Sequence, residues 1–180
     1  MATNIVAIVG SLQTTSINRN TANTVIGLAP EGMTISILDV SNVPLFNGDV
    51  EAQGKPASVV AVDEAVAAAD GVILFTPEYN GSWPAVTKNV YDWLTRPPKM
   101  LIDKPIAAVA TAPGPRAGLG VLTSIETVLD HMPDNYPRYD SFGIGKIGEK
   151  VGDDGMLNDE ETLTKLTAWI AGFGEFIAAQ

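Results

Sequence analysis

Short apolar runs alternate along this chain with longer segments of mixed character. Residues 4–9, 72–75 and 106–110 are mostly aliphatic, which is typical of strands buried on both faces of a parallel sheet. Residues 33–38 alternate at first between apolar and polar side chains, so we expect a strand there at an edge of the sheet. The stretch 136–147 is expected to contain the last strand.

The segments between these runs carry apolar side chains at the three- and four-residue spacing of amphipathic helices. We expect helices from the loop around residue 18 to about Leu28, over residues 57–69, from Pro84 to about Leu94, over residues 119–132 and over residues 159–178. In the second helix, the acidic side chains Asp63 and Glu64 are predicted to point outward, with Asp70 exposed just beyond it.

Strands that alternate with helices predict right-handed crossovers and one doubly wound parallel sheet with helices on both faces. The chain of 180 residues is expected to form a single domain over residues 1–180. Strand order 2-1-3-4-5 is the natural candidate for such a five-stranded α/β sheet.

Composition excludes several classes of site and partner. A formal net charge of −10 argues against nucleic-acid and anionic-membrane partners. The chain has no cysteine and one histidine, His131, so thiolate chemistry is excluded and we expect no metal site. We see no signal peptide and no stretch that approaches a transmembrane length, so a cytoplasmic location is expected.

The loop after the first strand, Gly-Ser-Leu-Gln-Thr-Thr-Ser-Ile-Asn at residues 10–18, has the parts of an anion site. Hydroxyl groups and the unpaired N–H groups of a following helix both favour a phosphate there. The loop matches neither GxGxxG nor GxxxxGK[ST], which disfavours dinucleotide and P-loop sites. Plain helix capping by the hydroxyls is the alternative.

The loop after the third strand, Pro-Glu-Tyr-Asn-Gly-Ser at residues 77–82, has the composition of an exposed turn. A further loop at residues 111–118, Thr-Ala-Pro-Gly-Pro-Arg-Ala-Gly, follows the fourth strand. Since all these loops follow the carboxyl ends of parallel strands, we expect them to meet at the edge where open α/β sheets bind ligands.

Two of these segments resemble a known family. The loop at residues 10–18 is similar to the G-S-L-R-x-x-S-x-N phosphate loop of the NAD(P)H-dependent FMN reductases, and residues 77–94 resemble their P-E-Y-N-x-S loop and K-N-x-x-D-W helix. Gln13 stands where the family usually has Arg, and Ala85 where it usually has Gly. The resemblance implies a flavodoxin-like fold and these FMN-binding residues: Ser11, Gln13, Ser16, Ile17, Asn18, Pro77, Glu78, Tyr79, Asn80, Gly81, Ser82, Ala112, Pro113 and Gly114.

The family resemblance also implies a reaction. Hydride passes from NADPH or NADH to FMN and then to a small-molecule acceptor such as a quinone, free flavin, azo compound or chromate. A chain without cysteine and with one histidine fits a cofactor that brings its own reactivity. The family is commonly dimeric or tetrameric, so a homodimer or homotetramer is expected. Tyr79 and Trp83 are expected to form an apolar wall beside the flavin, a subunit contact, or both.

Alternatives remain open from the sequence. A flavodoxin-like FMN-binding electron carrier without nicotinamide turnover is one, although its usual Thr-Gly-rich phosphate loop is absent. A flavin-free protein on the same scaffold is another. Arg116 is a candidate to pair with a cofactor phosphate or with a partner subunit's glutamate, or it is simply solvated. His131 is interpreted as a contact at a helix C-terminus, and residues 43–49 as an apolar plug.

Overall fold

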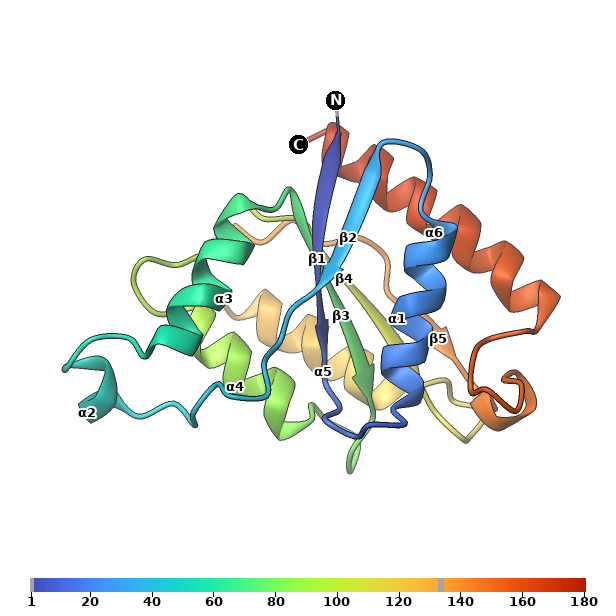
Figure 1. The fold of residues 1–180 in the computed structure, drawn as a ribbon, viewed down its shortest axis with the longest axis horizontal. Helices are drawn as coiled ribbons and strands as arrows, with labels where there is room; N and C mark the ends of the chain where they lie inside the picture. Colours follow the sequence, from blue (N-terminus) through green and yellow to red (C-terminus); the bar gives the residue numbers. More distant parts are fainter. Residues whose placement is uncertain (1, 133–134) are drawn as a thin grey trace.

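A computed structural model describes residues 2–132 and 135–180 of the chain. Figure 1 shows one sheet with helices packed on both of its faces. The elements in chain order are β1 (Thr3–Val9), α1 (Ile17–Leu28), β2 (Met33–Ile37), α2 (Gly48–Glu51), α3 (Ala57–Ala68), β3 (Gly71–Pro77), α4 (Ala85–Leu94), β4 (Ile106–Thr111), α5 (Leu119–Asp130), β5 (Phe142–Ile144), the 3₁₀ turn η1 (Ile147–Glu149) and α6 (Glu160–Ala178).

The five strands form one parallel sheet in the order β2-β1-β3-β4-β5. This confirms the predicted flavodoxin-like α/β fold and the predicted edge position of β2. Because every strand runs the same way, the carboxyl ends gather at one edge, whereas both chain termini lie at the opposite edge (Figure 1). The predicted helices are present, and α2 is an additional short helix that overlaps the end of the segment interpreted as an apolar plug.

Alternation along β1 divides the core into two layers. Ile5, Ala7 and Val9 face one layer with α1 and α6, while Val6 and Ile8 face the other with α3, α4 and α5 (Figure 1). The apolar stripes predicted for the helices supply the other half of each layer. The central strands are buried on both faces, which explains why they read as continuous apolar runs.

One acidic side chain of α3 departs from its predicted place. Asp63 was expected to point outward, but its side chain is buried and its Oδ2 lies 2.5 Å from Lys55 Nζ. Asp63 shares the buried stripe of α3 with Val62 and Val66, and the lysine just before the helix neutralises it there. The outward prediction for Asp63 is therefore wrong.

The predicted plug at residues 43–49 packs over α4. Trp93 Nε1 donates to Pro44 O at 2.8 Å, and the ring of Phe46 meets Trp93 edge-on at 5.0 Å between ring centroids. Asn89 adds hydrogen bonds to Phe46 N at 2.8 Å and to Pro44 O at 2.9 Å. Leu45 is exposed, so the segment covers α4 with only part of its apolar surface.

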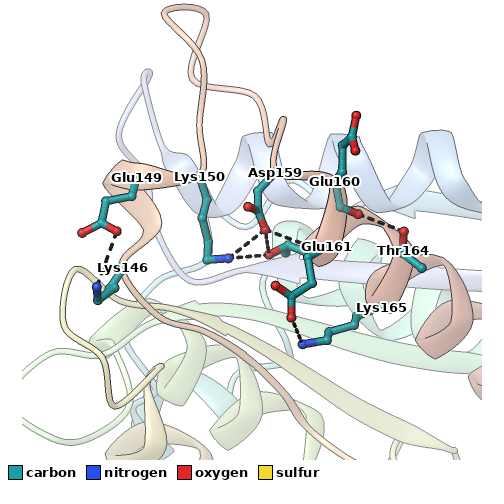
Figure 2. Close-up of polar contacts among 9 residues, drawn as sticks. Lys146, Glu149, Lys150, Asp159, Glu160, Glu161, Thr164 and Lys165 are labelled. Atoms are coloured by element: carbon teal, nitrogen blue, oxygen red, sulfur yellow. Dashed lines mark hydrogen bonds and ion pairs between the residues drawn. The ribbon is translucent and has the colours of Figure 1, made fainter.

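The start of α6 anchors the acidic segment that follows η1 (Figure 2). Asp159 caps the helix by accepting from Thr162 N at 3.0 Å, and Lys150 Nζ lies 2.8 Å from both Asp159 Oδ2 and Thr162 Oγ1. The hydrogen bond from Lys150, and then those from Thr162, lower the pKa of Asp159 to about 2. Asn20 of α1 donates to Gly155 O at 3.2 Å, so the segment is held against α1 as well.

Candidate active site

The loop between β1 and α1 is built as an anion cradle. Ser16 is the N-cap of α1, and its Oγ accepts from Arg19 N at 3.3 Å. Ile17 and Asn18 begin the helix, so their N–H groups have no carbonyl partner within it. Ser11 and Ser16 are buried, and the positive end of the helix dipole adds to their hydroxyl groups as a site for a phosphate.

Gly10 allows this loop to lie close to α4. A Cβ at this position would stand 2.3 Å from Thr87 Oγ1 and 3.3 Å from Pro84 Cγ. Real Cβ atoms do not approach that closely, so any larger residue would displace the loop from α4. The glycine therefore fixes where the cradle begins.

A buried hydrogen bond joins the cradle to β4. Thr111 Oγ1, at the carboxyl end of β4, donates to Asn18 Oδ1 at 3.0 Å, and both side chains are almost fully buried. The bond occupies one lone pair of the amide oxygen of Asn18, and the NH₂ group of that side chain remains as a donor. Asn18 thus belongs to the predicted site and also holds it to the sheet.

The loop after β3 forms a tight hairpin turn. Asn80 and Gly81 have φ of 54° and 74°, and the pair Tyr79 and Ser82 exchanges backbone bonds of 3.3 and 3.1 Å. Two left-handed central residues define a type I′ turn, for which Asn-Gly is the preferred sequence. Tyr79 stands at the base of this turn and is half-exposed. The structure thus gives the predicted exposed turn a defined type.

Backbone bonds hold the loop after β4 to the end of β5. Ala112 N donates to Ile144 O at 2.9 Å, and Ala112 O accepts from Ile147 N at 3.1 Å. Gly114 O accepts from Lys146 N at 3.1 Å. These bonds place Ile147 beside Pro113 at the sheet edge, and they use both backbone groups of Ala112, one of the predicted FMN-binding residues.

A cavity of about 290 Å³ lies where the three loops converge. The predicted residues that line it are Ser11, Gln13, Ser16, Ile17, Asn18, Pro77, Glu78, Tyr79 and Pro113. Five other predicted residues lie outside the lining: Asn80, Gly81, Ser82, Ala112 and Gly114. The lining also includes Thr15, Thr111 and Ile147, which the sequence did not single out.

The lining suits a phosphate-bearing planar group. The lining offers neutral hydroxyl, amide and helix N–H donors, and Tyr79, Pro113 and Ile147 supply apolar surface. Gln13 is present in the lining, so an uncharged amide stands where the family usually has a forked cation. Over residues 2–132 and 135–180 no group of histidine and carboxylate side chains has the arrangement of a metal site.

Comparison with known proteins shows the family of the chain. The family model described as NADPH-dependent FMN reductase matches residues 3–147, which includes all three loops. The chain belongs to this family. It is an FMN-dependent oxidoreductase that takes its electrons from NAD(P)H, which confirms the predicted fold, enzyme class and cofactors.

Relatives and solved structures agree with the family assignment. The quinone reductase of Escherichia coli strain K12 is 38% identical over 96% of this chain and 94% of its own. The 2-hydroxy-1,4-benzoquinone reductase of Burkholderia sp is 31% identical over 94% of this chain and 97% of its own. The structure of FerB, an NAD(P)H:(acceptor) oxidoreductase from Paracoccus denitrificans, superposes with a TM-score of 0.81 at 28% identity, over 98% of both chains. The electron-carrier and flavin-free alternatives are therefore set aside.

Three further side chains of this FMN reductase have roles predicted from the sequence. Trp83 is buried, with its ring 5.3 Å from that of Tyr91, and its role in a flavin wall or a subunit contact stays a prediction. His131 ends α5, and its Nδ1 lies 2.6 Å from Thr127 O, which confirms the local contact expected at a helix C-terminus. Arg116 is exposed on the loop after β4, and its role stays a prediction.

No helix in the described part of the chain combines the length and apolarity that a membrane crossing requires.

Proposed function

We propose that the cavity at the carboxyl edge holds FMN and that this flavin reduces a quinone. The convergence of three loops on one cavity, with most of the predicted residues in its lining, is the observation that carries the proposal. Two relatives that cover nearly the whole chain are named quinone reductases, which supports the choice of acceptor class.

Each part of the lining takes a role in binding. The hydroxyls of Ser11 and Ser16 and the first N–H groups of α1 hold the phosphate. The turn at residues 77–82 positions the ring, and Tyr79 and Pro113 limit the access of water to it. Bound FMN itself supplies the hydride-accepting and hydride-donating chemistry.

Exposed apolar side chains at this edge fit an aromatic acceptor. Leu12, Tyr79 and Leu119 come from three separate loops or helix starts beside the cavity, and about half of each side chain is exposed. A flat quinone that approaches the flavin would cover part of this apolar surface, and its burial would favour binding. The same side chains suit contact with a second copy of the chain, so we also propose a homodimer or homotetramer, active in the cytoplasm.

The test begins with the purified protein and added FMN, followed by visible spectroscopy without oxygen. We expect a bound-flavin spectrum that bleaches when NADPH or NADH is added and returns when 1,4-benzoquinone follows. Bleaching without recovery would reject a quinone as the acceptor. Flavin that binds without being reduced by either nucleotide, or no binding at all, would reject the proposal.

A further inference from the structure

Helix α5 begins beside the cavity without a cap of its own. Its N-cap residue is Gly118, which has φ of 75° and no side chain to accept a hydrogen bond. By contrast α1 and α6 begin at Ser16 and Asp159, whose side chains cap them. The first N–H groups of α5 therefore require an acceptor from elsewhere in the chain.

Glu78 supplies that acceptor from the turn after β3. Its Oε2 accepts from Val121 N at 3.1 Å, across 43 residues of sequence. A carboxylate at this place is also favoured by the positive end of the helix dipole. Glu78 lines the cavity and stands between Pro77, the last residue of β3, and the half-exposed Tyr79. The cap is thus formed by a residue of the turn that is predicted to bind FMN.

Gly120 leaves the space that this carboxylate occupies. A Cβ on Gly120 would stand 2.9 Å from Glu78 Oε2 and 3.1 Å from Oε1. Glycine is a poor helix former, yet it stands here in the first turn of α5. The close contact gives a physical reason for a residue that helix propensity alone disfavours.

A second contact ties the far side of the same turn to α5. Ser82 Oγ lies 3.3 Å from Ser124 Oγ, one helical turn beyond Val121. Glu78 and Ser82 bracket the type I′ turn, so both of its ends meet the first two turns of α5. The turn and the helix are therefore held as one unit.

We propose that Glu78 is a positioning residue that fixes the turn at residues 77–82 against α5, with its carboxylate directed to the helix and not to the flavin. The inference rests on the proposed FMN site. Because coupling is reciprocal, bound flavin also stabilises the start of α5 through this contact. Glu78 then acts on FMN affinity through the backbone of the turn, and Gly120 acts through Glu78.

Dissociation constants for FMN, measured by flavin fluorescence, test the proposal. Glu78→Ala is expected to raise the constant about tenfold, and Glu78→Gln to keep it within about threefold, because an amide oxygen still accepts from Val121 N–H. Gly120→Ala is expected to weaken binding about as much as Glu78→Ala, although alanine is the better helix former. Gly27→Ala in α1 is the matched control, since a Cβ there meets nothing within 4 Å.

The double variant Glu78→Ala with Gly120→Ala tests whether the two residues act through the same contact. If Gly120→Ala acts by displacing the carboxylate, it adds nothing once Glu78 is alanine, so the two effects are not additive. Exchange of the Val121 amide with D₂O should be faster in Glu78→Ala than in the wild type, and FMN should slow it in the wild type. If the wild type binds FMN, and Glu78→Ala and Gly120→Ala bind it with unchanged affinity, the positioning role of Glu78 is overturned while the proposed FMN site still stands. A wild-type protein that binds no FMN would overturn the proposed site as well.

Discussion

The cavity edge and the start of α6 use polar groups in opposite ways. At α6, Lys150 Nζ pairs with Asp159 Oδ2 at 2.8 Å (Figure 2). Thr162 Oγ1 lies 2.8 Å from Lys150 Nζ and 2.5 Å from Asp159 Oδ2, so the three side chains satisfy one another. At the cavity, the hydroxyls of Ser11 and Ser16 accept from backbone N–H groups. Within the described residues their O–H groups have no acceptor, so they remain as donors. Polar groups that are paired within the chain stabilise the fold, whereas donors left over at a helix N-terminus are available for a ligand.

The strongest test of this contrast removes the free donors. Ser11→Ala with Ser16→Ala is expected to raise the FMN dissociation constant about 100-fold, because each hydrogen bond to a charged phosphate contributes roughly 1.5 kcal/mol. Fluorescence titration measures the change. Ser58→Ala, which removes a serine hydroxyl from the first turn of α3, is the matched control. An unchanged dissociation constant in the double variant would remove these hydroxyls from the site.

The paired groups at α6 are expected to affect the thermal stability of the fold and not the affinity for FMN. Asp159→Ala removes the helix cap and the partner of Lys150, so the melting temperature of the apoprotein should fall by roughly 2–4 °C. Affinity for FMN should stay within about twofold, since the network lies outside the cavity lining. Glu161→Ala breaks only the exposed pair with Lys165 and should change neither quantity. A large loss of FMN affinity in Asp159→Ala would show that the start of α6 and the cavity do not have separate roles.

A smaller effect follows from the pKa of Asp159. The folded-state pKa is about 2 and the ordinary value is 3.8, so the ionised carboxylate stabilises the fold above about pH 4. That contribution is lost as the pH falls from about 4 towards 2. Urea unfolding at about pH 5 and about pH 2.5 should show the free energy of unfolding of the wild type and Asp159→Asn converging at the lower pH. A constant difference between the two would contradict the assignment.

The smallest effect is expected at the far end of α5. The ring of His131 hydrogen-bonds to Thr127 O of α5, the helix that it ends. Glu78 binds at the opposite end of this helix. His131→Gln should leave the rate of flavin reduction by NADPH unchanged in stopped-flow measurements. A large loss of this rate would assign the histidine a role that its place on α5 does not suggest.

The sequence predicts the parts of this molecule that depend on local pattern. Strands buried on both faces, such as β3, appear as apolar runs, and the Asn80-Gly81 pair appears as a turn. Strand β5 has only three residues, so its segment could be located but its bounds could not. The candidate loops were found because parallel strands bring their carboxyl ends together.

The sequence does not predict contacts between distant residues. The burial of Asp63 depends on Lys55, which lies outside the helical period of α3. Trp83 is buried against the ring of Tyr91 of α4, a contact that the sequence did not predict. Ile147 enters the cavity lining only because backbone bonds to Ala112 carry it there from beyond β5. The cap that Glu78 gives to α5 has no local signal at all.

The strand order has a consequence for synthesis of the chain. Strand β1 leaves the ribosome before the other strands, but it lies inside the sheet between β2 and β3, and the contact of Asn4 with Asp70 spans 66 residues. At about 5–20 residues per second, roughly 3–13 s pass before β3 follows β1 out of the ribosome. During this interval β1 has no β3 partner on that side. We therefore expect the nascent chain to be most prone to aggregation and to chaperone binding before β3 has emerged.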